Sequence, residues 1–204
     1  MRPDEARGPG GKPLRMQRPH RSKLPPGEVR LIGGRLKRSK LPVPDHPGLR
    51  PTPDRVRETL FNWLGQDLSG WRVLDAFAGS GALGFEAASR GAATVLLLEQ
   101  DGGLVASLLA SAQRLGTPEL RVQRTDALRW MATAEPDSFE LVLLDPPFEA
   151  GQLVPAIAVA APLVAPDGFL YVESPGLPGE PPAGLQAWRS LKAGAVHAQL
   201  WRRT

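Results

Sequence analysis

The chain has 204 residues, 42% of them hydrophobic, which is enough to bury one sizeable core. Because it has no cysteine and only three widely separated histidines, a disulfide framework is excluded and a metal site is not expected. No apolar run approaches the roughly 20 residues of a membrane span and no secretory signal is recognisable, so we expect a cytoplasmic protein without membrane contact.

Positive charge is concentrated in the first quarter of the chain. Residues 1–50 hold 13 Lys and Arg against 4 Asp and Glu, whereas the remainder holds 12 against 17. A basic N-terminal segment followed by a mildly acidic remainder is typical of a protein that binds a polyanion, although a solvated tail has the same composition. Residues 1–27 carry six prolines and four glycines without apolar periodicity, so we expect a disordered basic extension.

Residues 28–53 are expected to form a basic β-hairpin followed by a proline-rich connector. The segment 29–32 is strand-like, the pair Gly33-Gly34 indicates a tight turn, and residues 35–41 form the returning strand. Basic side chains in this unit are candidates for contacts with the phosphates of a polyanion. They are Arg30, Arg35, Lys37, Arg38 and Lys40.

A helix is expected next, with Thr52 as its N-cap, Pro53 at its first position and Gly65 at its end. From residue 71 onward, strand, turn and helix patterns alternate. Strands are predicted at 73–78, 94–98, 120–123, 139–144 and 169–173, and helices at 82–90, 104–115, 127–134 and 153–164. This alternation favours an α/β domain over residues 54–204, with a mostly parallel sheet, helices on both faces and a terminal hairpin within 191–202.

The first chemical motif is a glycine loop between a strand and a helix. Gly79, Gly81 and Gly84 match G-x-G-x-x-G, and Glu99 follows Gly79 by 20 residues at the tip of the next strand. Glycines let the backbone approach a cofactor, and an acid at that place can accept hydrogen bonds from both ribose hydroxyls. The motif alone leaves both NAD and S-adenosylmethionine open.

Asp75, four residues before the first glycine, favours S-adenosylmethionine. A carboxylate is repelled by a pyrophosphate but attracts an ammonium and a sulfonium. The competing interpretation is that Asp75 only caps the glycine loop. Phe77 and Ala78 complete the expected cofactor loop.

The second motif, Asp145-Pro146-Pro147-Phe148, follows an apolar strand and suits methylation of an exocyclic amine. The lone pair of such an amine is conjugated into the base. Hydrogen bonds from the amine to the Asp145 carboxylate and the Pro146 carbonyl draw its nitrogen toward tetrahedral geometry, and Phe148 stacks on an extruded base. The prolines fix the backbone and leave carbonyls without competing N–H groups. The competing interpretation is a rigid turn that only ends the strand.

From residue 28 onward the chain resembles the bacterial 16S rRNA (guanine-N2) methyltransferase family of the RsmD type. The matching strings are Arg30–Gly34, Lys40–Pro44, Pro47–Thr52, Asp54–Leu64, the glycine loop, D-P-P-F and Tyr171–Ser174. The resemblance implies a class I, Rossmann-like methyltransferase fold with a seven-stranded sheet. It also implies that Asp126 contacts the adenine amine of S-adenosylmethionine and that Thr52 borders the cofactor. Pro53 departs from the family's usual second threonine, and residues 1–27 have no recognised counterpart.

The function expected from this resemblance is methylation of a guanine N2 in 16S rRNA, within the small ribosomal subunit or an assembly intermediate, by a monomer without a metal. Three alternatives stay open from the residues alone. The D-P-P-F chemistry also serves an amino-methyltransferase acting on DNA adenine or cytosine. The glycine loop suits an NAD-dependent oxidoreductase, and the basic N-terminal segment suits an RNA-binding protein that keeps the fold without catalysis.

Overall fold

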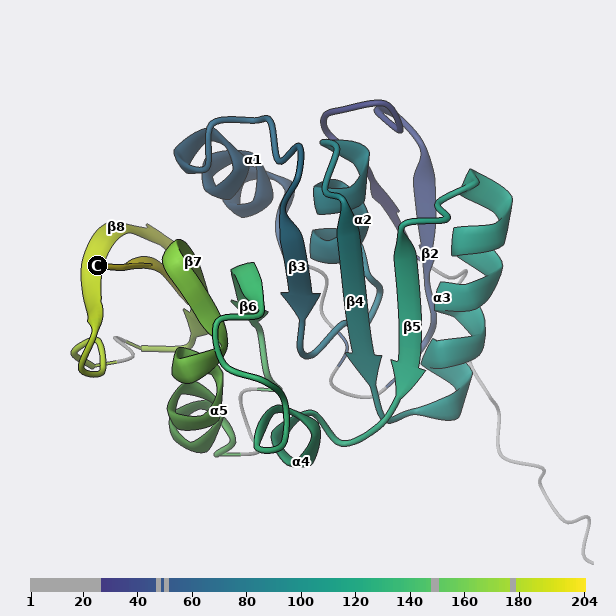
Figure 1. Cartoon of the computed structure of the whole chain (residues 1–204). Coiled ribbons are helices and arrows are strands. Elements are labelled where there is room, and N and C mark those ends of the chain that lie inside the picture. Colours follow the sequence, from purple (N-terminus) through teal and green to yellow (C-terminus); the bar gives the residue numbers. More distant parts are fainter. Residues whose placement is uncertain (1–26, 47–48, 50–51, 148–150, 177–178) are drawn as a thin grey trace, which may run out of the picture.

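The computed structural model describes residues 27–46, 49, 52–147, 151–176 and 179–204 (Figure 1). The expected disordered extension lies outside these residues apart from Gly27, and so does Phe148.

A seven-stranded sheet forms the centre of the structure, in the order β5-β4-β3-β6-β7-β9-β8. Its strands are β3 (Arg72–Asp75), β4 (Thr94–Glu99), β5 (Leu120–Arg124), β6 (Phe139–Leu144), β7 (Val164–Ser174), β8 (Leu185–Ala193) and β9 (Val196–Arg203). Strands β3 to β7 run parallel, whereas β9 is antiparallel to both β7 and β8. The predicted mostly parallel, seven-stranded sheet is confirmed.

Helices cover both faces of this sheet (Figure 1). They are α1 (Asp54–Trp63), α2 (Ala82–Ser89), α3 (Gly102–Leu115), α4 (Ala127–Met131) and α5 (Leu153–Ala160), which the short 3₁₀ helix η2 (Ala161–Leu163) extends. Side chains alternate along a strand, so each strand contributes to two cores. On β6, Leu141 and Leu143 pack in the core that includes α1, α2 and α3, while Val142 and Leu144 pack with α4 and α5. Burial on both faces explains why the central strands β4 and β6 are almost continuously apolar.

The topology places two strand ends beside one another at the carboxyl edge. The chain passes from β3 through β4 to β5, then returns to add β6 on the other side of β3. Open α/β sheets bind ligands at the point where the strand order reverses. Asp75 ends β3 and Asp145 follows β6, so both predicted motifs lie at this point.

The N-terminal strand pair differs from the predicted hairpin in its turn. Strands β1 (Gly27–Arg30) and β2 (Lys40–Val43) pair antiparallel, as expected for a hairpin. However, residues 31–39 connect them, so the prediction of a tight turn at Gly33-Gly34 is wrong. The connection is held by α2 instead. The Gly33 N–H donates to Glu86 Oε1 at 2.8 Å, and the Arg35 N–H donates to the Ser89 carbonyl at 2.8 Å.

The start of α1 also corrects a prediction. The N-cap is Pro53, α1 begins at Asp54, and no side chain caps it. Thr52 therefore is not the N-cap, because its hydroxyl donates to Asp145 Oδ2 instead, at 3.1 Å. The terminal hairpin is confirmed but begins earlier than predicted, since β8 pairs with β9 from Leu185 onward.

Candidate active site

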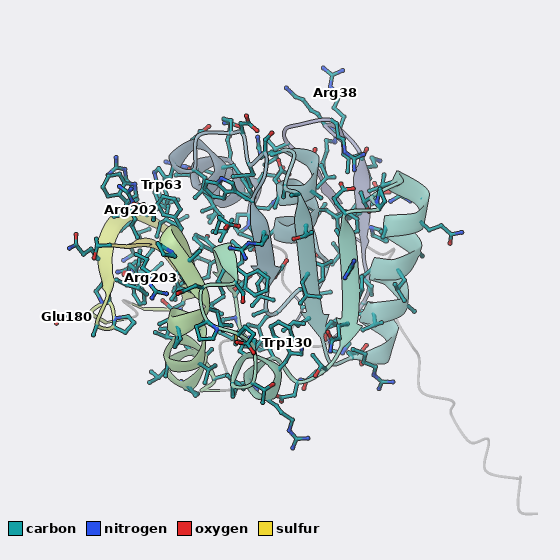
Figure 2. All side chains as sticks on the ribbon, in the orientation of Figure 1. Arg38, Trp63, Trp130, Glu180, Arg202 and Arg203 are labelled. Atoms are coloured by element: carbon teal, nitrogen blue, oxygen red, sulfur yellow. The ribbon has the colours of Figure 1, made fainter. Side chains whose placement is uncertain are left out.

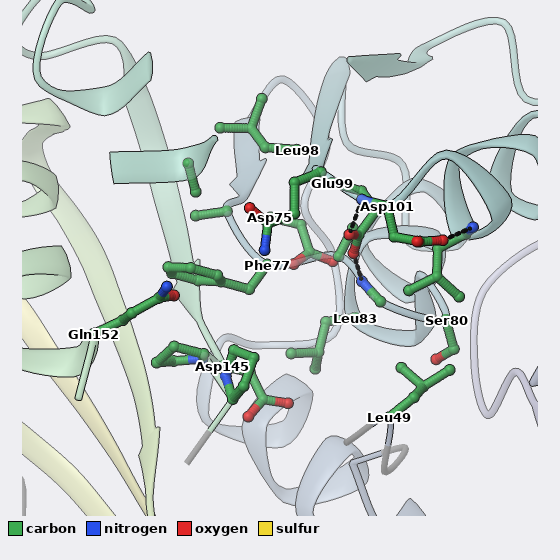
Figure 3. A pocket seen from close by; sticks show the side chains of 18 of the residues that line it. Leu49, Asp75, Phe77, Ser80, Leu83, Leu98, Glu99, Asp101, Asp145 and Gln152 are labelled. Atoms are coloured by element: carbon green, nitrogen blue, oxygen red, sulfur yellow. Dashed lines mark hydrogen bonds between the residues drawn. The ribbon is translucent and has the colours of Figure 1, made fainter. Parts of the chain in front are cut away.

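A cavity of about 350 Å³ opens at the carboxyl ends of the central strands (Figure 3). This volume lies within the range of small-molecule sites. The cavity is lined by ten of the predicted site residues: Thr52, Asp75, Phe77, Ala78, Gly79, Glu99, Asp126, Asp145, Pro146 and Pro147. Figure 3 shows Glu99 and Asp101 at one side of the cavity and Asp145 and Gln152 at the other. The fold therefore brings the glycine loop and the D-P-P turn into one pocket.

Glu99 holds the glycine loop in place. Its Oε2 accepts a hydrogen bond from the Gly79 N–H at 3.0 Å, and its Oε1 accepts one from the Asp101 N–H at 2.9 Å. Each carboxylate oxygen can accept a second hydrogen bond. Glu99 is thus able to shape the loop and to accept hydroxyl groups of a ligand at the same time.

Asp75 is 1% exposed at the end of β3. Its Oδ2 accepts a hydrogen bond from the Gly84 N–H in the first turn of α2, at 3.0 Å. Burial raises the pKa of Asp75 to about 7, and the charges of Asp145 and Glu99 contribute to this rise. Asp75 therefore has the capping role, and it also faces the pocket, where a cationic ligand would relieve the repulsion among the three acids.

Asp126 is positioned by the helix that follows it. Its Oδ1 accepts a hydrogen bond from the Arg129 N–H at 2.8 Å and so caps α4. Asp126 lines the pocket beyond the end of β5, next to Thr125 and Ala127. This capping bond holds the carboxylate at the rim, where its remaining lone pairs can accept from a ligand amine.

Gly81 does not line the pocket. Close approach of the backbone to a cofactor therefore does not explain a glycine at this position. It has a φ of +79°, and a Cβ built on it would lie 2.6 Å from Leu108 Cδ2 and 2.8 Å from Phe85 Cδ2. The glycine is required by the turn into α2 and by core packing. Gly79, in contrast, lines the pocket directly.

Asp145 lies at the end of β6, half-buried, with Oδ2 bonded to the Thr52 hydroxyl. Burial raises the pKa of Asp145 to about 6, and the hydrogen bond from Thr52 opposes this rise. At neutral pH the group is therefore mainly the carboxylate. Pro146 and Pro147 continue along the pocket wall, and Phe148 lies outside the described residues.

Comparisons with known proteins identify the family of the chain. Residues 29–202 match the family described as Conserved hypothetical protein 95. Ribosomal RNA small subunit methyltransferase D of Escherichia coli K12 is 42% identical over 181 residues, which cover 87% of this chain and 91% of that protein. The protein of the same name from Haemophilus influenzae is 40% identical over 153 residues, 72% of this chain and 79% of that one. The solved structure of yhhF from Escherichia coli superposes with a TM-score of 0.77 at 40% identity, covering 87% of this chain and 98% of that one.

The chain belongs to the RsmD family. It has the class I methyltransferase fold of that family, and the family and fold imply a methyl donor of the S-adenosylmethionine type. The pocket suits such a donor because Asp75, Glu99 and Asp126 place carboxylates along it, which complement a cation, hydroxyl groups and an amine.

Glu173 is a buried acid that does not itself line the pocket. The sequence pointed to it only through the family resemblance of Tyr171–Ser174. Glu173 is 2% exposed on β7, and its Oε1 accepts a hydrogen bond from the Tyr171 hydroxyl at 2.7 Å. Its signal in the sequence is an acid two residues after a tyrosine near the end of an apolar strand, which places both side chains on one face. The apolar pattern of the strand does not reveal whether an acid near its end is buried or exposed to solvent.

The predicted RNA-binding residues are not brought to the pocket. The loop that carries Arg35 is held at Ser89, the last residue of α2, whereas Ala82 at the other end of α2 lines the pocket. Figure 2 shows Arg38 at the edge of the sheet where the strands begin, opposite the pocket. If these residues bind RNA, they contact a part of it remote from the target base.

Two of the five basic residues are already ion-paired. Arg35 pairs with Glu119, and Lys40 Nζ lies 2.6 Å from Glu28 Oε2. Within the described ranges, no ion pair is found for the remaining three, which are Arg30, Lys37 and Arg38. Among the same residues, no group of three potential metal ligands and no helix that could span a membrane is present.

Proposed function

We propose that this protein uses S-adenosylmethionine to methylate the exocyclic N2 amine of a guanine in small-subunit (16S) ribosomal RNA. The observation that carries the proposal is the meeting of the Asp145-Pro146-Pro147 turn with a carboxylate-lined cofactor loop in one cavity. The names of the relatives support ribosomal RNA of the small subunit as the substrate class. The chemistry of the turn supports an exocyclic amine as the target, and the resemblance to guanine-N2 methyltransferases supports N2 of guanine.

In this proposal each part of the donor has a partner among the pocket residues. Glu99 accepts the ribose hydroxyls, Asp126 accepts the adenine amine, and Asp75 faces the ammonium and sulfonium charges. When bound, S-adenosylmethionine supplies an electrophilic methyl group and a neutral thioether as the leaving group. No covalent enzyme intermediate is required, so the chain needs only to position and orient the reacting groups.

Asp145 orients the target amine. Its Oδ2 is held by Thr52, which leaves Oδ1 to accept a hydrogen bond from one amine hydrogen, while the Pro146 carbonyl accepts from the other. These two bonds favour a tetrahedral nitrogen whose lone pair points at the methyl carbon. The nitrogen forms its new bond there, and its excess proton passes to Asp145 Oδ1 or to water. Phe148 remains the predicted stacking partner of the extruded base.

A substrate comparison tests the proposal. Small-subunit particles that lack the modification and unmethylated genomic DNA are incubated with the protein and labelled S-adenosylmethionine, and the products are digested to nucleosides for mass spectrometry. We expect N2-methylguanosine from the particles and no methylated base from the DNA. N6-methyladenine or N4-methylcytosine from the DNA would favour the DNA amino-methyltransferase instead, and binding of NADH in place of S-adenosylmethionine would favour the oxidoreductase.

A further inference from the structure

Three acids face the same side of the sheet at the ends of three adjacent strands. Asp75 of β3 pairs in register with Leu143 of β6, which pairs with Tyr171 of β7. The register runs on to Leu144 and Val172, and its continuation by one residue sets Asp145 beside Glu173. Because strand side chains alternate, Asp145 and Glu173 point to the face that Leu143 and Tyr171 share, the face covered by α1.

Glu173 has neighbours on its own strand and on, or just beyond the ends of, three other strands. Tyr171 donates to it from its own strand, at 2.7 Å, and Ala198 is its apolar partner on β9. Asp145 faces it from the end of β6 and Asp75 from the end of β3, and both negative charges raise the pKa of Glu173. Burial is the largest cause. It holds the pKa of Glu173 well above its ordinary value, although the hydrogen bonds with Tyr171 and Thr52 act to lower it.

Thr52 lies between the two neighbouring carboxyl groups. Its hydroxyl donates to Asp145 Oδ2 at 3.1 Å. The same hydroxyl lies near Glu173, where donation to a Glu173 carboxylate would lower the pKa of that acid. A hydroxyl has one proton and two lone pairs. Once the proton is directed to Asp145, the Thr52 oxygen can only accept from Glu173, and only a protonated Glu173 has a hydrogen to donate.

We propose that Glu173 is a positioning residue for the methyl transfer, which acts as a neutral acid and donates through Thr52 to fix the Asp145 carboxylate. The chain of donors runs from Tyr171 to Glu173, then to Thr52 and finally to Asp145. When every hydrogen bond in this series points toward Asp145, the four side chains carry one negative charge, and it lies on the group that meets the target amine. The series also fixes the orientation of Asp145, whose Oδ1 remains for the substrate. The inference rests on the proposed function, because it assigns Asp145 to the amine.

The test compares two replacements of Glu173 in the full chain. Glu173→Gln keeps a neutral side chain with one donor and one acceptor end, so it imitates the protonated acid. Glu173→Ala removes the donor. For both variants and the wild type, the single-turnover rate, the KM for small-subunit particles, the affinity for S-adenosylmethionine and the pH profile are measured. Glu140→Gln is a control, because Glu140 lies on β6 but pairs with Arg72 away from the pocket.

We expect Glu173→Gln to retain at least one third of the wild-type rate with an unchanged pH profile. Glu173→Ala is expected to lose tenfold or more in rate, with KM and cofactor affinity within threefold. If the alanine variant does not fold, Thr52→Val takes its place, and the double variant Thr52→Val with Glu173→Gln should be no slower than Thr52→Val alone.

Two results would overturn the inference. A Glu173→Gln rate as low as that of the alanine variant, or a pH profile shifted toward acid, would mean that Glu173 acts as an anion. A wild-type rate in Glu173→Ala, or in Thr52→Val where that variant substitutes for it, would mean that the acid has no positioning role. A wild-type protein that does not methylate the particles would instead contradict the proposed function, so the two failures are distinguishable.

Discussion

Asp75 Oδ2 accepts a hydrogen bond from the Gly84 N–H at 3.0 Å, so a carboxylate that lines the pocket is also the cap of α2. The two roles make different demands on the side chain. Capping needs only an acceptor oxygen, whereas attraction of a cationic donor needs the negative charge. A change that keeps the oxygen and removes the charge therefore separates them.

Asp75→Asn is expected to weaken the binding of S-adenosylmethionine by about 1–3 kcal/mol while leaving the fold intact. Isothermal titration calorimetry measures the affinity, and circular dichroism checks α2. S-adenosylhomocysteine, which lacks the sulfonium charge, should lose less affinity than S-adenosylmethionine in this variant. Equal affinities of wild type and variant for S-adenosylmethionine would reduce Asp75 to its capping role.

The same variant should change how stability depends on pH. The pKa of Asp75 is about 7 in the folded protein against an ordinary value of 3.8. Between these values the folded state binds more protons than the unfolded state, so the free energy of unfolding falls as pH rises. The wild type should therefore lose stability from pH 4 to pH 7 relative to Asp75→Asn. Urea denaturation at several pH values measures the free energy of unfolding of both proteins. The same pH dependence in the two proteins would contradict a raised pKa of Asp75.

Activity should depend on the ionisation of Asp145. The carboxylate is the form that accepts from the amine, and its pKa is about 6, so the single-turnover rate should fall as pH drops through this value. Thr52→Val removes the hydrogen bond that lowers this pKa, and the midpoint of the profile should move to higher pH. Thr52→Ser keeps the hydroxyl and should keep the midpoint. A profile that is flat between pH 5 and pH 8 would exclude Asp145 as the titrating group.

Gly81 should prove structural. A side chain there meets Leu108 and Phe85 and requires a φ of +79°, so Gly81→Ala is expected to lower the free energy of unfolding by about 1–3 kcal/mol. Gly194→Ala is the matched control, because its φ is +61° and nothing lies within 4 Å of its Cβ, so it should cost less. Calorimetry on folded Gly81→Ala should give a wild-type affinity for S-adenosylmethionine. Reduced affinity in a protein of wild-type stability would return Gly81 to the cofactor site.

Much of this structure follows from local pattern in the sequence. Strands β4 and β6 were predictable because both of their faces are largely buried and their residues are almost all apolar. The connection between β1 and β2 was not predictable from local pattern. It depends on hydrogen bonds to Glu86, a buried acid of α2 that is 54 residues away from Ile32 in the chain. The bond between Thr52 and Asp145 likewise joins residues that only the fold brings together. The sequence showed Thr52 as a helix cap because that is the local role of threonine before a helix.

The loop of residues 31–39 should contribute RNA affinity through Lys37 and Arg38, for which no ion pair is found within the described part of the chain. Neutralising Lys37 and Arg38 to glutamine should lower the slope of log affinity against log salt concentration by about 1 for each phosphate that is no longer neutralised. The matched double variant, Arg35→Gln with Lys40→Gln, should change the slope less, because both cations already pair with glutamates. Filter binding to 16S rRNA fragments at several salt concentrations measures both. Equal slopes for the wild type and the Lys37/Arg38 variant would show that this loop is a solvated surface.

The central claim is that Asp145 orients a guanine amine of small-subunit rRNA for methylation. Its most direct test is the single-turnover formation of N2-methylguanosine on small-subunit particles, followed by mass spectrometry, for the wild type and Asp145→Ala. We expect the wild type to form N2-methylguanosine and Asp145→Ala to be slower by about 100-fold or more, with unchanged affinity for S-adenosylmethionine. Methylation by Asp145→Ala at nearly the wild-type rate, or a methyl group on another atom of the base, would contradict this account.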